Sequence, residues 1–179
     1  MIYYEDESYI VRTMEERDVQ ELVQGEIAQG WQATDDKYLL RLKDQREEKC
    51  IALIVECGHS AVDYVSVYFN QLAGPFVDSG YPEIVDLGVL EKYRKLGVGS
   101  LLMDTAEKIA FEISDGICIG VGLHSGYGSA QRMYVKRGYI PDGSSVWYRD
   151  AVCEQYAECC NDDDLVLYFS KQINVSRET

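Results

Sequence analysis

The residues with the clearest chemical potential lie where an apolar run gives way to a helical pattern. Lys92, Arg94 and Lys95 place three positive charges there, in a chain whose net charge is −14. Gly97 and Gly99 follow directly, and glycine lets a backbone approach a ligand closely. The first amides of a helix have no partner inside the helix, and the helix dipole adds partial positive charge at that end. The segment therefore predicts an anion site of the kind that holds phosphate groups.

Two nucleotide-binding patterns are excluded for this turn. The dinucleotide fingerprint needs a third glycine, and Leu102 stands at that place. No Gly-Lys-Ser/Thr follows, so the turn is not a P-loop either. A plain helix start with solvated lysines is the alternative that this segment leaves open when it is taken alone.

Two motifs together resemble one family. The turn matches the Arg/Gln-x-x-Gly-x-Gly/Ala pattern of the GNAT superfamily of N-acetyltransferases, with Arg94-Lys95-Leu96-Gly97-Val98-Gly99. Further along, the chain is similar to the Ala-x-x-x-Tyr-x-x-x-Gly-Phe/Tyr signature of the same superfamily, with Ala130, Tyr134, Gly138 and Tyr139. The resemblance extends over the order of elements from about Tyr9 to Ser170.

The resemblance implies acetyl-coenzyme A as co-substrate and assigns backbone groups to it. In the superfamily, amides of this turn hold the pyrophosphate of coenzyme A. Here those amides would belong to Leu96, Gly97, Val98, Gly99 and Ser100, with Arg94 and Lys95 in the same motif. Backbone groups at the end of the preceding strand would pair with the pantetheine arm, namely those of Leu87, Gly88 and Val89.

The resemblance also implies the catalytic groups for amine acetylation. Tyr134 matches the tyrosine that acts as general acid toward the sulfur, and its alternative is a core tyrosine. Glu83 lies eleven residues before Arg94, the spacing of the glutamate base in histone-acetylating members, and its alternative is a surface glutamate at a strand end. Burial would raise the pKa of a base toward the working pH. Asp86 and His124 are weaker rivals.

The sequence departs from the family pattern just before the second motif. Many members have Asn seven residues before the tyrosine, and here Tyr127 stands there. Gly126 and Gly128 on either side offer backbone groups as a replacement. Ser125 is not a hydrolase nucleophile, because Leu123 breaks the Gly-x-Ser-x-Gly pattern.

The positioning elements follow from periodicity. A capping-box spacing of Thr13 and Glu16 predicts a helix start, and a second helix is expected over 36–48. Strands are expected over 9–12, 50–56, 61–69, 83–90, 117–123, 145–148 and 165–170, a loop over 70–82, and further helices over 97–113 and 129–136. This order predicts an α/β (α+β) GNAT fold in one domain over 1–179. Its mixed sheet would have about seven strands, splayed between the fourth and fifth, flanked by about four helices.

The composition of the chain limits which partners and which cellular compartment are expected. The acidic balance argues against nucleic-acid binding and favours a cationic acceptor, although solubility alone explains much of the excess. No apolar run approaches a membrane span, no basic apolar leader opens the chain, and a cytoplasmic protein is expected. The spacing of the six cysteines and two histidines argues against a metal site and favours reduced thiols, with Cys159 and Cys160 exposed. A homodimer through the apolar strand 165–167 is a further expectation.

Two functions remain open from the sequence. The first is direct transfer of an acetyl group from acetyl-coenzyme A to an amine in a ternary complex. The first two helices and Trp31 would form the acceptor wall, as the resemblance implies, and the acceptor is a small cationic amine or a peptide or protein amine. The alternative is a non-catalytic module that binds or senses acyl-coenzyme A, which the departure at Tyr127 motivates.

Overall fold

The computed structural model describes residues 1–71 and 73–173. The chain forms two compact units from interleaved segments, and each unit is described by itself. The first unit contains residues 1–68 and 84–109, and the second contains 69–83 and the chain from 110 onward.

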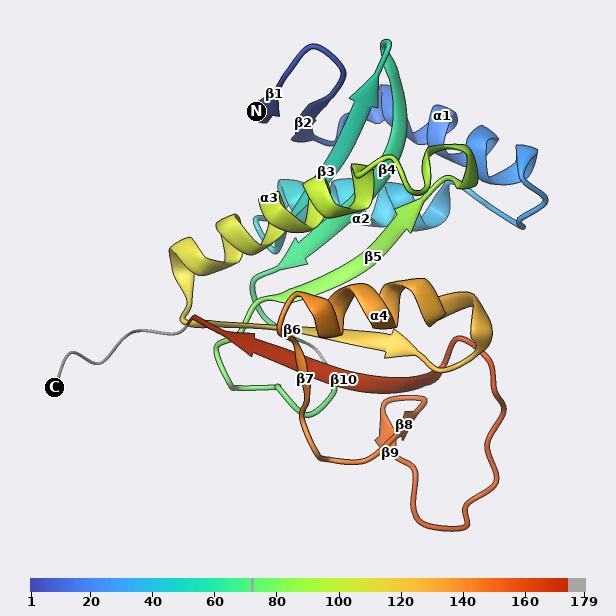
Figure 1. The fold of residues 1–179 in the computed structure, drawn as a ribbon, viewed down its shortest axis with the longest axis vertical. Helices are drawn as coiled ribbons and strands as arrows, with labels where there is room; N and C mark the ends of the chain where they lie inside the picture. Colours follow the sequence, from blue (N-terminus) through green and yellow to red (C-terminus); the bar gives the residue numbers. More distant parts are fainter. Residues whose placement is uncertain (72, 174–179) are drawn as a thin grey trace, which may run out of the picture. The chain divides into compact units, whose positions relative to one another are not determined.

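The first unit is built on strands in the order of the sequence (Figure 1). They are β1 (Ile2–Glu5), β2 (Ile10–Thr13), β3 (Cys50–Cys57), β4 (Ser60–Tyr68) and β5 (Glu83–Val89). The pairs from β1 to β4 are antiparallel. Gly58 and His59 both have positive φ in the tight turn between β3 and β4, as a two-residue hairpin turn requires.

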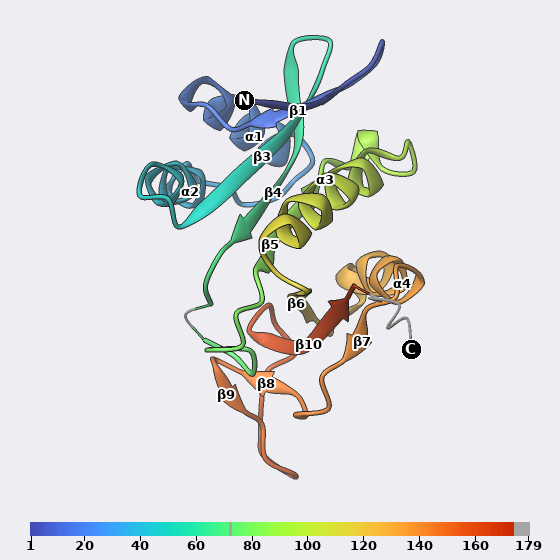
Figure 2. The same cartoon turned by 90° about the vertical axis from the view of Figure 1, so that its left-hand side faces the viewer.

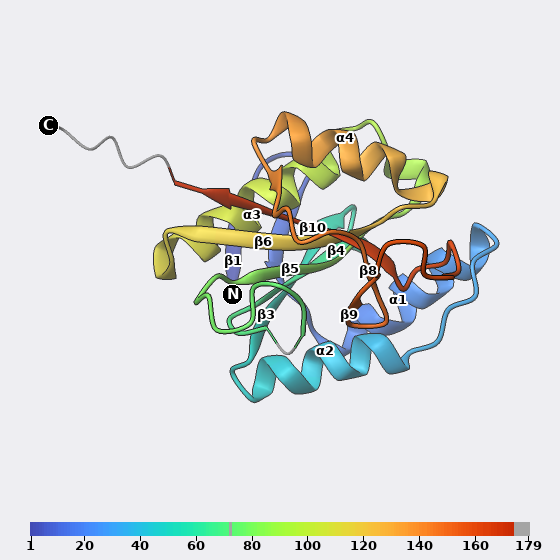
Figure 3. The ribbon, with the colours of Figure 1, turned by 90° about the horizontal axis from the view of Figure 1, so that it is seen from below.

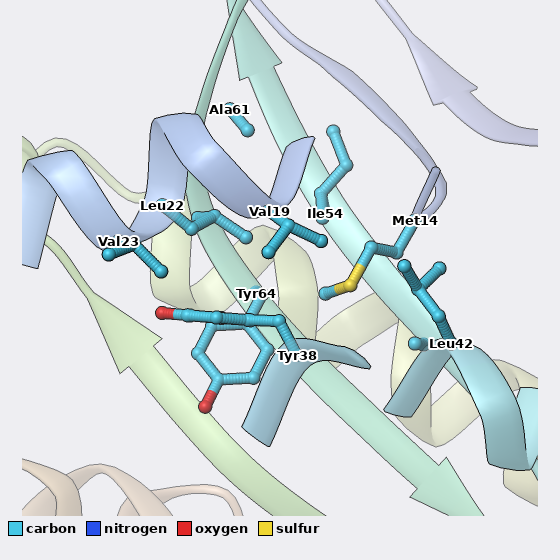
Figure 4. Close-up of a cluster of buried hydrophobic side chains, with 10 residues drawn as sticks. Met14, Val19, Leu22, Val23, Tyr38, Leu42, Ile54, Ala61 and Tyr64 are labelled. Carbon is cyan, nitrogen blue, oxygen red and sulfur yellow. The ribbon is translucent and has the colours of Figure 1, made fainter. Parts of the chain in front are cut away.

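Helices cover both faces of this sheet. Figures 2 and 3 show α1 (Glu16–Ala28) and α2 (Asp36–Arg46) on one face and α3 (Val98–Ile113) on the other. The core beneath α1 and α2 is drawn in Figure 4, and its members are Met14, Val19, Leu22, Val23, Tyr38, Leu42, Ala52, Ile54, Ala61 and Tyr64. On α3 the buried stripe is Val98, Leu102, Met103, Ala106 and Ile109. Burial of these apolar faces fixes the helices on the sheet.

The predicted start of the first helix was wrong by two residues. The N-cap is Glu15, and its amide donates to Asp18 Oδ2 over 2.7 Å in a capping box. Thr13 instead ends β2, and its hydroxyl accepts a hydrogen bond from the N-terminal ammonium group over 2.7 Å. The hydroxyl is therefore engaged by β1, a strand that the sequence pattern had not shown.

The second unit is an antiparallel arrangement in the order β6, β10, β8, β9, with β7 also paired to β10. Its strands are β6 (Gly116–Gly122), β7 (Ile140–Pro141), β8 (Trp147–Tyr148), β9 (Ala151–Val152) and β10 (Leu165–Gln172). Helix α4 spans Gly128–Lys136. The two-residue strands β7 and β9 were not predicted, because two residues show no periodicity.

The last strand, β10, was expected to pair with a second copy over 165–167. Val166 of β10 is paired with Gly122 of β6 on one side and with Trp147 of β8 on the other, whereas Leu167 is paired with Val121 of β6. At Val166 both edges of the strand are therefore occupied inside the unit, and the homodimer stays a prediction.

The remaining expectations concern elements and cysteines. The second helix ends at Arg46 rather than 48, because Glu48 adopts a positive φ of 56°. The loop expected over 70–82 has no helix or strand in its described residues, and residue 72 lies outside them. Cys159 and Cys160 are exposed, as predicted, whereas Cys50 and Cys118 are buried. No helix within 1–71 and 73–173 is long and apolar enough to cross a membrane.

Candidate functional site

The predicted anion site lies in the first unit, where β5 leads into α3. A short 3-10 turn, η1 (Glu91–Tyr93), follows the strand, and Lys95 and Gly97 then adopt positive φ angles of 64° and 88°. The helix ladder opens with the Leu101 amide donating to the Gly97 carbonyl over 3.0 Å. The amides of the preceding helical residues, Val98 to Ser100, have no acceptor within a helix by geometry, and they point out of its end. Gly97 supplies the left-handed backbone that aims them there.

The glycines of this turn fit a close-lying phosphate. A Cβ on Gly97 would meet no atom within 4 Å, so the space beside its backbone is open. A Cβ on Gly99 would lie 3.0 Å from Val89 Cγ2, which is tighter than most such contacts, so Gly99 allows the first turn of α3 to pack close to β5. The residues present therefore fit the pyrophosphate of coenzyme A, with Lys92, Arg94 and Lys95 as nearby cations.

Arg94 also stabilises the shape of the turn. Its Nε donates to the Val89 carbonyl over 3.3 Å, and a terminal nitrogen lies 3.4 Å from Glu91 Oε1. The guanidinium lies over the Trp31 ring, 5.6 Å from its centroid. Trp31, which was expected at the acceptor wall, thus contacts Arg94 of this turn. The motif arginine links the turn to β5 and to Trp31, which follows α1 in the chain.

The strand before the turn is kinked at Asp86, whose φ is 60°. Its carboxylate is paired with Arg41 of α2 over 2.7 Å. After the kink, Leu87, Gly88 and Val89 are half-buried, as strand residues with an open side would be. A Cβ on Gly88 would lie 2.9 Å from the Tyr64 ring, so only glycine fits there without displacement of the ring.

Glu83 begins β5 and belongs to the second unit. It is half-buried, and its charge contributes to the pKa shifts of two neighbouring residues. The pKa of Tyr168 is raised to about 12, first by burial and then by the Glu83 carboxylate. Burial and then Glu83 also raise the pKa of the Cys118 thiol. Glu83 therefore sits beside an aromatic hydroxyl and a thiol that are both held neutral.

Tyr134 lies on α4 in the second unit and is only 4% exposed. Its ring centroid is 5.9 Å from that of Tyr139, at a tilt of 60°. Gly138 ends the helix with a φ of 89°, and the Tyr139 amide donates to the Tyr134 carbonyl over 3.0 Å. Within the motif, Gly138 and Tyr139 thus have a structural role in closing the helix and holding Tyr134.

Both ring nitrogens of His124 are engaged in hydrogen bonds. Its Nε2 lies 3.0 Å from Asp163 Oδ1, and its Nδ1 accepts from the Gly126 amide over 3.1 Å. The Tyr127 hydroxyl donates to the same Asp163 oxygen over 2.9 Å. Hydrogen bonds from His124 and then Tyr127 lower the pKa of Asp163. No sequence signal pointed to Asp163, which lies far along the chain and meets the histidine only after folding.

Tyr127, at the place of the family asparagine, also packs on β6. A Cβ on Gly122 would lie 2.4 Å from the Tyr127 ring, so the ring packs directly against that glycine. A separate apolar hollow of about 460 Å³ lies between α4, β6 and β10, and its lining includes Val135, Leu167 and Phe169. Tyr134 is not among its lining residues. No group of three or more His, Cys, Asp or Glu within the described residues could hold a metal ion.

The structure thus places the predicted site residues in two surroundings. Leu87 to Val89 and Arg94 to Ser100 come together in the first unit, whereas Glu83 and Tyr134 belong to the second. Sequence reasoning missed the ion pairs that hold these parts, such as Arg41 with Asp86, because their members are distant in sequence.

Known structures share this fold. A ribosomal-protein-alanine N-acetyltransferase from Brucella melitensis is 15% identical with a TM-score of 0.63, covering 91% of this chain and 99% of that one. An acetyltransferase of the GNAT family from Streptococcus pneumoniae is 19% identical with a TM-score of 0.63, covering 92% and 99%. The PaiA N-acetyltransferase from Thermoplasma acidophilum, solved with coenzyme A, is 12% identical with a TM-score of 0.63, covering 93% and 99%.

The predicted mixed α/β fold of the GNAT type is therefore confirmed, with four α-helices among the described residues. No curated protein matches the chain in sequence. The sequence model of the acetyltransferase (GNAT) family matches residues 14–139, which is more than half of the chain and includes both motifs. The chain belongs to the GNAT family of acetyl-coenzyme A-dependent N-acetyltransferases.

Proposed function

We propose that this enzyme transfers the acetyl group of acetyl-coenzyme A to an amine by direct attack in a ternary complex. The observation that carries the proposal is the turn into α3, with its outward amides, the positive φ of Gly97 and the open space beside the Gly97 backbone. We further propose that both units act as one domain over 1–179, in the cytoplasm.

The bound co-substrate supplies an acyl thioester. The amides of Leu96 to Ser100 would hold its pyrophosphate, and backbone groups of Leu87 to Val89 would orient its pantetheine arm. Glu83 would take a proton from the acceptor ammonium, directly or through a water, which frees the nitrogen lone pair for attack. The nitrogen–carbon bond forms as the carbon–sulfur bond breaks, and the Tyr134 hydroxyl would donate its proton to the leaving sulfur. The second proton that the nitrogen loses as it becomes an amide would restore the tyrosine hydroxyl.

The acceptor is proposed as a small cationic amine or a peptide or protein amine. The net charge of −14 supports a cationic acceptor, because it attracts positive ligands over distance. The structurally similar protein from Brucella melitensis is named a ribosomal-protein-alanine N-acetyltransferase, which supports a protein amine as the alternative acceptor.

The decisive experiment combines binding and turnover. Acetyl-coenzyme A is expected to raise the melting temperature of the purified protein, and an amine panel is expected to release coenzyme A thiol. Absence of both effects would end the proposal. Binding without turnover on a broad panel would instead support the non-catalytic acyl-coenzyme A module.

Tyr134→Phe tests the proposed acid. Loss of a general acid is expected to lower kcat by about 10²–10⁴-fold. The KM for acetyl-coenzyme A is expected to change little, since only the hydroxyl is removed and the buried ring remains. Steady-state kinetics on thiol release make the measurement. Wild-type kcat in this variant would exclude Tyr134 as the acid.

A further inference from the structure

The side-chain ammonium group of Lys37 is held by three residues: Glu26 of α1, Tyr38 of α2 and Tyr64 of β4. We call these three residues the ammonium box. Lys37 Nζ lies 2.7 Å from Glu26 Oε1. The same nitrogen lies 4.8 Å from the centroid of the Tyr38 ring and 5.5 Å from that of Tyr64. The two rings meet edge to face, with centroids 4.9 Å apart (Figure 4). One carboxylate and two ring faces around one cation are the chemistry by which proteins recognise ammonium groups.

Two buried polar atoms of these residues are available for a further hydrogen bond. Glu26 is 5% exposed and Tyr38 is fully buried. Within the described residues, neither Glu26 Oε2 nor the Tyr38 hydroxyl has a hydrogen-bond partner of normal geometry, although the two groups lie close enough for the carboxylate to raise the pKa of Tyr38. A buried carboxylate oxygen without a donor is costly, so a second donor at this place would be stabilised. A ligand with an N–H group supplies such a donor.

The surrounding charges favour a cation. Burial and then the Glu26 and Asp86 carboxylates raise the pKa of Tyr38, and burial and then the Asp86 carboxylate raise the pKa of Tyr64. Arg41 is the counter-charge on the same side, and it is already paired with Asp86 over 2.7 Å. Asp63 is held neutral by burial, so the charges around the two rings are the Glu26 and Asp86 carboxylates with Lys37 and Arg41 as their counter-charges. If Lys37 swings away, the Glu26 carboxylate is left without a cation.

The Lys37 side chain can be displaced from this site. Its side chain is 40% exposed, whereas that of Glu26 is 7% exposed. It sits near the start of α2, so its long side chain can swing into solvent without disturbing the helix. An incoming ammonium group would then find the carboxylate and both rings in place.

We propose that Glu26, Tyr38 and Tyr64 bind a non-reacting ammonium group of the acceptor, with Lys37 as an internal occupant that the acceptor displaces. An ammonium group paired with a buried carboxylate keeps its proton and cannot attack a thioester. The acceptor must then carry a second amine that reacts, so its class is a small diamine or polyamine. This substrate class rests on the proposed acetyl transfer, whereas the ammonium box itself does not.

The first test uses binding alone. Lys37→Ala empties the box, and n-propylammonium chloride is then titrated against the melting temperature, with NaCl at equal ionic strength as reference. A saturable rise is expected for Lys37→Ala, at concentrations about tenfold lower than for the wild type, where the tethered lysine competes. Lys43→Ala is the matched control, because Lys43 is paired with Glu47 on the exposed side of the same helix.

The second test uses turnover with paired acceptors. Putrescine carries two amines and n-propylamine carries one. Lys37→Ala is expected to lower the KM for putrescine by about tenfold, and Glu26→Gln to raise it by at least as much, with kcat changed less than twofold in both. Neither variant is expected to alter the ratio of kcat to KM for n-propylamine.

The outcomes separate the two proposals. No propylammonium-dependent stabilisation of Lys37→Ala beyond that of NaCl would overturn the box and show that the pair is only structural. Stabilisation that persists in Glu26→Gln/Lys37→Ala would also overturn it. Stabilisation without acetylation of any amine would leave the ammonium box standing and refute acetyl transfer. Acetylation of n-propylamine as efficient as that of putrescine would refute the diamine class.

Discussion

Glu83 is the residue that we propose as the base. It combines partial burial with two neutral neighbours, Cys118 and Tyr168, whose pKa values its charge helps to raise. The motif spacing, through its resemblance to the family, motivates this glutamate as the proposed base. Glu83→Gln replaces one carboxylate oxygen by an amide nitrogen, and its effect on kcat tests the proposed role as base.

Glu83→Gln is expected to lower kcat for amines of high pKa by about 10²–10⁴-fold, because their ammonium forms need a base. The loss is expected to shrink at alkaline pH and with acceptors of low pKa, which are already neutral in solution. A pH profile of kcat across such acceptors makes the measurement. An equal loss at every pH and for every acceptor would indicate a positioning role instead.

At the scale of elements, the turn from β5 into α3 depends on backbone that only glycine adopts freely. Gly97→Ala places a side chain at a φ of 88°, which costs about 1–2 kcal/mol. Relief of that strain would rotate the outward amides. The dissociation constant for coenzyme A, measured by calorimetry, is therefore expected to rise about tenfold or more.

Gly143→Ala is the matched control for this prediction. Gly143 has a φ of 85° and, like Gly97, has no atom within 4 Å of the Cβ position. The two variants are expected to lose similar stability, and only Gly97→Ala is expected to lose coenzyme A affinity. Equal affinities in both variants would remove Gly97 from the proposed phosphate site.

The placement of α1 depends on one buried arginine. Arg12 of β2 binds Asp18 through two hydrogen bonds of 2.7 and 2.8 Å and Glu56 of β3 through another of 2.9 Å. Arg12→Ala would leave the buried Asp18 carboxylate unpaired, and the free energy of unfolding is expected to fall by about 3–5 kcal/mol in urea titrations. Arg17→Ala is expected to cost less than about 1 kcal/mol, because the Arg17 side chain is 65% exposed. Similar losses in both variants would contradict this account.

At the scale of the whole molecule, one buried carboxyl couples stability to pH. Asp63 is fully buried on β4, its Oδ1 accepts from the Tyr64 amide over 2.7 Å, and its Oδ2 has no partner within the described residues. Burial raises the pKa of this carboxyl well above its ordinary value. The folded protein therefore keeps a proton that the unfolded chain releases above about pH 4.

Since unfolding then releases a proton, Asp63 makes the free energy of unfolding fall as pH rises from about 4 to the folded pKa, by about 1.4 kcal/mol per pH unit. Asp63→Asn keeps the Oδ1 acceptor and removes the titration. Urea titrations between pH 5 and 8 are expected to show the variant gaining stability relative to the wild type as pH rises.

Asp44→Asn provides a contrast of opposite sign. A hydrogen bond from Tyr68 lowers the pKa of Asp44, so its stabilisation is present above the unfolded pKa and is lost as pH falls through the folded pKa. This variant is expected to be less stable than the wild type at pH 7, with a difference that narrows in acid. A difference between wild type and Asp63→Asn that does not change with pH would refute the buried neutral carboxyl.

The sequence by itself determined the helices and long strands, because apolar periodicity depends on neighbours along the chain. It also determined the glycine turn and the Tyr134 segment, because both rest on residues a few positions apart. Its errors lie where local patterns compete with distant partners. Thr13 fitted a helix cap by spacing, but its hydroxyl is taken by the N-terminus through β1.

Only the tertiary structure decided which charges meet. Lys37 with Glu26, Arg41 with Asp86 and His124 with Asp163 are pairs across elements. It likewise decided that both edges of β10 are occupied at Val166 and that Asp63 is buried, since strand order and burial are properties of the packed chain. Local spacing encodes the motifs of this acetyltransferase, and packing decides the electrostatic setting in which each of them operates.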